Sequence, residues 1–122
     1  METHATKHTH VRKLDGAVVI KPHGNLMGGE ETDEIERLIE GFNAEKVPCL
    51  VINLVDVGMM NSLTISRLIR GHLKFSQRNA RIHLCNLDKR IQNIFVIAKL
   101  SMVFNIYPSE ELALQACRGE TA

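Results

Sequence analysis

The sequence has 122 residues, the length of one ordinary domain, and can bury a core without disulfides or a structural metal. Hydrophobic residues make up 44% of the chain and charged residues 24%, which excludes a disordered or fibrous protein. The formal net charge is +1, and lysine and arginine are spread along the chain, so we expect no nucleic-acid partner.

The sequence patterns for membrane spans, signal peptides and cysteines together favour a cytoplasmic protein. No apolar run reaches the roughly 18 residues that span a membrane, and the first ten residues lack the hydrophobic segment of a signal peptide. We therefore expect a cytoplasmic protein without membrane insertion. The three cysteines, Cys49, Cys85 and Cys117, are far apart and odd in number, which predicts buried free thiols.

The first ten residues are polar and rich in threonine and histidine, and we predict that 1–10 form a flexible N-terminal arm. Its histidines are not expected to form a metal site, because no rigid scaffold is evident. Two strand patterns follow at 11–14 and 17–20, joined by the turn dipeptide Asp15-Gly16. A glycine-rich loop then occupies 24–29.

Helical and strand patterns alternate from here. A helix is predicted from about Thr32, because its apolar residues recur every three or four positions. The apolar run at 49–55 predicts a strand buried on both faces. A second helix follows, which either Asn61 or Ser62 can cap.

The last third of the chain repeats this alternation. Residues 80–85 predict a strand in which His83 lies on the polar, exposed side. Asp88 can cap a third helix, 103–107 predict an edge strand, and a last helix begins after Pro108. The pattern predicts one α/β domain over 11–118, with a mostly parallel sheet of four to five strands and about four helices packed against it.

Enzyme motifs are missing from the sequence. It has no phosphate loop followed by Lys-Ser or Lys-Thr, no Cys-x-x-Cys pair and no Gly-x-Ser-x-Gly elbow. Because no nucleophile, base and oxyanion stabiliser occur together, we expect a protein that is not an enzyme and uses neither cofactor nor metal. A small nucleotide-binding domain built on the loop 24–29 stays open as an alternative.

The most informative segment is 59–64, which follows the buried strand and leads into the second helix. Ligands and partners meet open α/β sheets at the carboxyl ends of strands, and a helix N-terminus favours an anion. Ser62 is thus a hydroxyl at a place suited to carry phosphate, which would add about −1.5 to −2 charge units. From the motif alone, plain helix capping by Asn61 and Ser62 is the simpler interpretation.

The stretch 53–62 resembles the STAS family of bacterial anti-sigma factor antagonists, in which a hydrophobic strand, a turn and two apolar residues precede Asp-Ser-Ser/Thr-Gly. Gly24-Asn25-Leu26 is similar to the family's Gly-x-Leu, and 86–113 is similar to its last part. The resemblance covers about 14–117. Here Asn61 stands for the aspartate, Leu63 for the second hydroxyl residue and Thr64 for the glycine.

The resemblance implies a partner-switching module in transcription regulation. It would bind a serine-kinase anti-sigma factor and be controlled by phosphorylation at Ser62, with Thr64 as the secondary acceptor candidate. The implied partner-binding residues are Asn25, Met60, Asn61, Ser62, Leu63 and Thr64. The alternative within the family is a scaffold or transporter-associated subunit that binds its protein partner constitutively, without phosphorylation.

Overall fold

The computed structural model of the chain describes residues 2–119, and a six-stranded sheet runs through its centre. Strands β1 and β2 are antiparallel to their neighbours, whereas β3 to β6 run parallel to one another. The order of strands across the sheet is their order in the chain. The strands are β1 (Glu2–Ala5), β2 (Thr9–Leu14), β3 (Ala17–Pro22), β4 (Cys49–Asn53), β5 (Arg81–Cys85) and β6 (Asn105–Tyr107).

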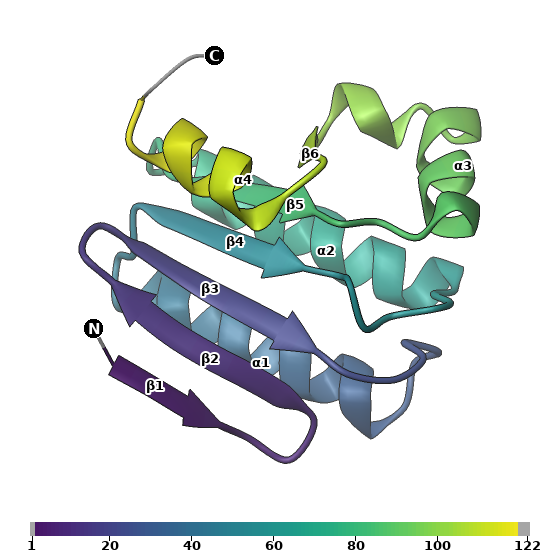
Figure 1. Cartoon of the computed structure of the whole chain (residues 1–122), viewed down its shortest axis with the longest axis horizontal. Coiled ribbons are helices and arrows are strands. Elements are labelled where there is room, and N and C mark those ends of the chain that lie inside the picture. The colour runs from purple at the N-terminus through teal and green to yellow at the C-terminus, as the bar shows by residue number, and fades with distance from the viewer. Residues whose placement is uncertain (1, 120–122) are drawn as a thin grey trace.

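Helices pack on both faces of the sheet, two long ones on one face and a shorter one on the other (Figure 1). They are α1 (Glu30–Ala44), α2 (Ser62–Ser76), α3 (Lys89–Ile97), the short 3-10 helix η1 (Leu100–Met102) and α4 (Glu110–Cys117). Helices α1 and α2 lie side by side against one face, and α4 lies across the other (Figure 1). This arrangement confirms the predicted α/β fold with its mostly parallel sheet. Within residues 2–119 no helix is long and apolar enough to cross a membrane.

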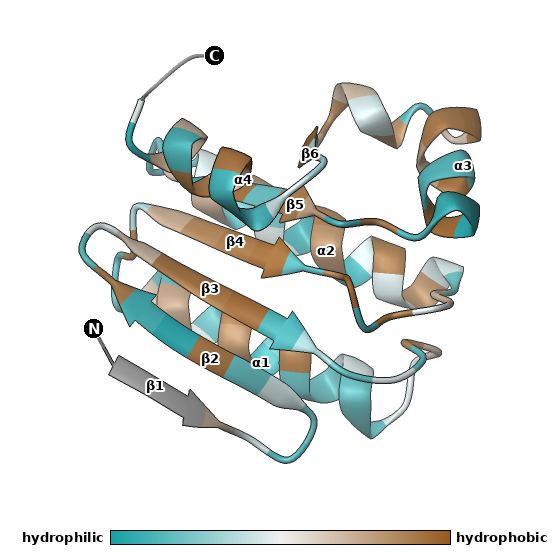
Figure 2. Cartoon of the chain, in the orientation of Figure 1, coloured by the Kyte–Doolittle hydropathy of each residue, from teal (hydrophilic) through white to brown (hydrophobic). Residues whose placement is uncertain are grey.

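Strand β4 holds the two layers together. All five of its residues are buried, as the sequence predicts for a central strand. Leu50 and Ile52 belong to the main core with α1 and α2, whereas Val51 points the other way and packs with Ala113 of α4. Figure 2 shows the result as hydrophobic colour along most of β3 and β4, with hydrophilic colour towards their carboxyl ends. Because both faces are packed, the carboxyl end of β4 is a fixed point from which the following loop starts.

Residues 2–10, part of the segment that the sequence predicts as a flexible N-terminal arm, contain strand β1 and the start of β2 in the structure. Strand β1 pairs antiparallel with β2, and the turn between them is tied to α1 through Glu34. The Glu34 carboxylate accepts hydrogen bonds from the Thr6 hydroxyl and, at 3.0 Å, from the His8 N–H. Although burial opposes the shift, these hydrogen bonds hold the pKa of Glu34 below its ordinary value.

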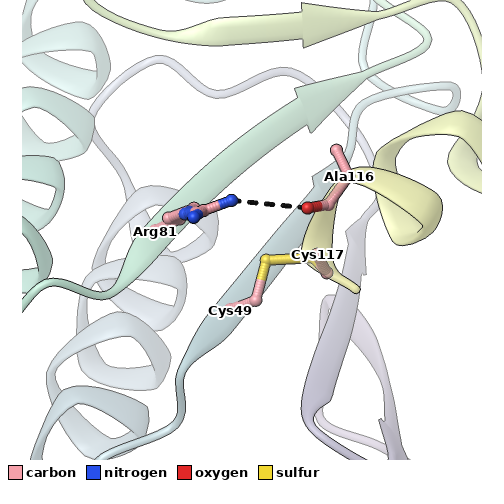
Figure 3. The surroundings of a disulfide bond; sticks show 4 residues. All are labelled: Cys49, Arg81, Ala116 and Cys117. Atoms are coloured by element: carbon pink, nitrogen blue, oxygen red, sulfur yellow. Dashed lines mark hydrogen bonds between the residues drawn. A yellow bond between two sulfur atoms is a disulfide. The ribbon is translucent and has the colours of Figure 1, made fainter. Parts of the chain in front are cut away.

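The face under α4 also departs from expectation. Cys49, at the start of β4, and Cys117, the last residue of α4, form a disulfide (Figure 3) rather than two free thiols. Cys85 is free and buried, and burial raises the pKa of its thiol to about 12. His83, predicted to be exposed, is only 1% exposed, and burial lowers the pKa of its imidazole to about 4. Its side chain is on the polar phase of β5, but helix α4 packs on that face.

Candidate functional site

Two loops meet at the carboxyl edge of the sheet and position the start of α2. The loop 23–29 follows β3, and the loop 54–61 follows β4. Leu26 forms a parallel bridge with Met60, and the Leu26 carbonyl accepts a hydrogen bond from the Asn61 N–H at 3.1 Å. The backbone that leads into α2 is therefore held by ladder-like hydrogen bonds rather than left as a free loop.

The N-terminus of α2 carries the positive end of the helix dipole, and no acidic residue of the first turn offsets it. Asn61 is its N-cap, and the Asn61 Oδ1 accepts a hydrogen bond from the Thr64 N–H at 3.2 Å. Ser62 is the first helical residue, and its side chain is exposed. The first turn of α2 contains no acidic residue, so no carboxylate of the helix offsets its dipole there. An anion carried by Ser62 would lie beside N–H groups that have no partner within the helix.

Thr64 and Met60 lie inside the protein, which contradicts the surface roles expected for them. Thr64 is 1% exposed, and its hydroxyl donates to the Leu26 carbonyl at 2.7 Å and lies 2.9 Å from the Thr32 Oγ1. A kinase cannot reach a hydroxyl that is buried and hydrogen-bonded in this way. Thr64 instead fastens α2 to the loop 23–29 and to α1. Met60 is 2% exposed and offers a partner almost no side-chain surface.

Exposed apolar side chains lie in the two segments that meet at the start of α2. Leu63 is 42% exposed and Met27 is 51% exposed, and Asn25 is exposed as well. Leu63 packs directly over Gly28, where an added Cβ would lie only 2.8 Å from the Leu63 Cδ2. This contact brings the loop 23–29 next to the first turn of α2. The resulting surface, which we call the edge surface, consists of Asn25, Met27, Asn61, Ser62 and Leu63.

Charged groups contact both loops that carry the edge surface. The His23 Nδ1 lies 3.1 Å from the Asp56 Oδ2, which links the two loops. From α3, the Arg90 Nη2 donates to the Gly58 carbonyl at 3.3 Å and brings a guanidinium to the loop 54–61. The segments next to Ser62 therefore combine the exposed apolar side chains of Met27 and Leu63 with a cation that contacts the loop 54–61, a combination suited to contact with another protein.

The loop 24–29 is not arranged as a phosphate cradle. The N–H groups of Gly24, Leu26 and Gly28 all donate within the protein, at 3.2, 2.9 and 2.9 Å. A phosphate-binding loop needs such N–H groups for its ligand. Leu63 also fills the space above Gly28. These contacts speak against the nucleotide-binding alternative.

Comparison with known proteins agrees with this geometry. A family model described as "STAS domain" matches residues 8–113. An anti-sigma factor antagonist from Mycobacterium paratuberculosis is 24% identical, with 90% of this chain and 92% of that chain covered and a TM-score of 0.79. The Bacillus cell fate determinant SpoIIAA in its phosphorylated form is 16% identical, with 88% and 97% covered and a TM-score of 0.71.

A relative of a different kind has the same fold. The STAS domain of a SulP transporter from Vibrio cholerae is 23% identical, with 84% of this chain and 80% of that chain covered and a TM-score of 0.62. No curated protein sequence matches this chain significantly. At these identities the solved structures show a common fold, whereas the family model spans most of the chain, including both loops and all of α2. The chain therefore belongs to the STAS domain family.

Proposed function

We propose that this protein is an anti-sigma factor antagonist that binds a serine-kinase anti-sigma factor through its edge surface, and that phosphorylation of Ser62 weakens this binding. The observation that carries the proposal is the exposed Ser62 hydroxyl at the start of α2, next to exposed Leu63 and Met27. Solved proteins of this fold include anti-sigma factor antagonists, one of them in a phosphorylated form. The role is one of binding, and the catalysis belongs to the partner.

The phosphorylation step requires only a reachable hydroxyl from this chain. The Ser62 Oγ attacks the γ-phosphorus of ATP held by the kinase, the bond to the ADP oxygen breaks, and the hydroxyl proton passes to a base of the kinase. The product carries about −1.5 to −2 charge units and three acceptor oxygens. At the first position of α2 the helix dipole stabilises that charge by about 0.3–1 kcal/mol. Phosphorylation therefore leaves the domain folded.

The same phosphate opposes binding of the partner. A partner that covers Leu63 and Met27 must remove water from their surroundings, and Ser62 lies within that area. Burying a phosphate without matching donors carries a large desolvation cost. Each 1.4 kcal/mol of this cost, on the order of one hydrogen bond to a charged group, lowers the affinity tenfold. Binding is thus switched by charge at one residue, without any change of fold.

A second candidate function follows from two residues of the edge surface. Leu63 offers an apolar contact where the resemblance has a hydroxyl residue, and Asn61 lacks the carboxylate. A surface of this kind suits constitutive binding to a scaffold or to a transporter, and the SulP transporter STAS domain has the same fold. In that case the affinity for the partner does not depend on charge at Ser62.

The test maps the phosphorylated residue and then compares the partner affinity of variants with and without a negative charge at residue 62. Serine-kinase anti-sigma factors encoded in the same genome are incubated with the protein and ATP, and the modified residue is mapped by mass spectrometry. Partner affinity is then measured by calorimetry for wild type, Ser62→Ala and Ser62→Asp. Ser76→Asp is the matched control, because it adds the same charge at the other end of α2, about 21 Å away.

We expect phosphate on Ser62, near wild-type affinity for Ser62→Ala and Ser76→Asp, and at least tenfold weaker binding for Ser62→Asp. Equal affinity of Ser62→Asp and wild type would overturn the switch and favour the constitutive role. Loss of phosphate incorporation in Ser62→Ala confirms the site, whereas undiminished incorporation moves it elsewhere.

A further inference from the structure

A second group of reactive side chains lies on the opposite face of the sheet, under α4. Cys49 begins β4, and in the register of the sheet it lies opposite Arg81 of β5, two residues before His83. The side chains of Cys49 and His83 therefore point to the same face, where Cys117 ends α4. The two sulfur atoms and a ring nitrogen of His83 all lie within 4.8 Å of one another.

His83 is the unusual member of this group. It is 1% exposed, and neither of its ring nitrogens has a hydrogen-bond partner among the described residues. Leaving a buried polar group without a hydrogen-bond partner is unfavourable for the folded state. Tyr107 packs edge-on against the imidazole, with the ring centres 5.2 Å apart, and fixes one side of it. A buried imidazole without a partner beside two sulfur atoms indicates a ligand that the disulfide state does not hold.

We propose that Cys49, Cys117 and His83 form a metal site for a divalent cation of the zinc type, which is available only when the disulfide is reduced. Two thiolates and one imidazole are a ligand set that zinc prefers, at about 2.3 Å for sulfur and 2.0 Å for nitrogen. A tetrahedral site of this size places its sulfur atoms about 3.8 Å apart, so the two sulfur atoms must separate after reduction, while both already lie within 4.8 Å of the His83 nitrogen. Cys117 is only half-buried, which leaves room for water as the fourth ligand.

The disulfide and the metal-bound dithiol exclude each other, because the same two sulfur atoms form both. The conversion of one into the other is chemically balanced. A dithiol reductant gives two electrons and two protons to the Cys49–Cys117 disulfide and becomes a disulfide itself. The cation then displaces the two thiol protons to solvent, and neutral His83 binds without losing a proton. Two thiolates would neutralise the charge of the cation. The Arg81 side chain lies beside the two cysteines (Figure 3), where its Nη1 donates to the Ala116 carbonyl at 3.4 Å, and its positive charge would favour the thiolate form.

Either state ties the end of α4 to β4. The disulfide does so covalently, and a bound cation would do so through coordination. The free dithiol alone would leave this end of α4 held only by packing and by the Arg81 hydrogen bond. The site is separate from the edge surface, because Cys117 ends α4, which lies on the face of the sheet opposite α2 (Figure 1).

Cobalt is the probe of choice, because thiolate ligation gives Co²⁺ a near-ultraviolet charge-transfer band and tetrahedral geometry gives it intense visible bands. The full chain is reduced with a phosphine, which does not compete for the metal, and titrated with Co²⁺ and then with Zn²⁺. We expect one Co²⁺ per chain, displaced by one Zn²⁺, and no thiolate band in the oxidised protein. The comparison of reduced and oxidised wild type needs no variant that must fold.

Variants identify the ligands. His83→Gln and Cys117→Ser are expected to weaken binding by about tenfold or more, whereas Cys85→Ala, which removes the third cysteine, keeps both affinity and spectrum. A reduced wild type without a thiolate band overturns the proposal. So does a His83→Gln variant that is folded and binds Co²⁺ as tightly, and with the same spectrum, as wild type.

Discussion

Replacing Thr64 by valine removes one buried hydroxyl and keeps the shape of the side chain. That hydroxyl lies 2.7 Å from the Leu26 carbonyl and 2.9 Å from the Thr32 Oγ1. Both partners keep another hydrogen bond, since the Asn61 N–H donates to the Leu26 carbonyl and the Gly28 N–H donates to the Thr32 Oγ1. We therefore expect Thr64→Val to lower the free energy of unfolding by about 1–2 kcal/mol.

Urea and thermal denaturation measure this loss directly. With an unfolding entropy of about 2.1 cal/mol/K per residue, 1–2 kcal/mol corresponds to a Tm lower by about 4–8 °C. Thr64→Ser, which keeps a hydroxyl, serves as the control and should lose less. In the double variant with Thr32→Val, the two losses should overlap by about 0.5–1 kcal/mol, because they remove the same contact. Wild-type stability for Thr64→Val, or strictly additive losses, would refute the assignment of Thr64 as a structural fastener.

Three further predictions concern the cap, the loop and the sheet. Asn61→Ala should lower the free energy of unfolding by about 1 kcal/mol, whereas Asn61→Asp keeps the cap and the stability; equal urea midpoints for both would contradict this. Gly28→Ala should cost about 1 kcal/mol or more, because its φ is +89° and the new methyl group meets Leu63; unshifted NMR signals of the Leu63 methyls would show the contact is absent. Although burial opposes the shift, a hydrogen bond from Asn53 holds the pKa of Glu110 below its ordinary 4.5. The stability from Glu110 is thus present above that pH and lost as pH falls through the lower folded value. Glu110→Gln should therefore make the free energy of unfolding depend less on pH on the acid side. The same acid pH dependence of stability in variant and wild type would contradict this.

Short-range patterns were enough to predict most of the framework. The apolar run at 49–55 indicated β4 because a strand packed on both faces needs no polar side. The apolar stripe of α1 and the cap residues of α2 and α3 likewise identified those helices, and Asn61 and Asp88 do accept the capping hydrogen bonds. The exposure of Ser62 was also implied by its place at the end of a helix. These features depend on neighbours within a few residues.

The features that the sequence did not reveal depend on contacts between distant residues. Glu34 fixes the turn before β2 from 26–28 residues away, and Cys49 pairs with Cys117 across 68 residues. Thr64, like Ser62, is a hydroxyl residue in the first turn of α2, yet the Thr32 side chain that contacts its hydroxyl lies on another helix. His83 alternates with apolar residues as an exposed residue does, but α4 covers it. The surroundings of these residues are set by the packing of α1 and α4 on the sheet, which local sequence patterns do not show.

The most direct measurement on the proposed switch is the affinity of the kinase partner for the unmodified and the Ser62-phosphorylated protein, taken by calorimetry at one salt concentration. The proposed mechanism predicts binding at least tenfold weaker for the phosphorylated form, with the thermal stability of the domain not lowered. Equal affinities for the two forms would contradict it.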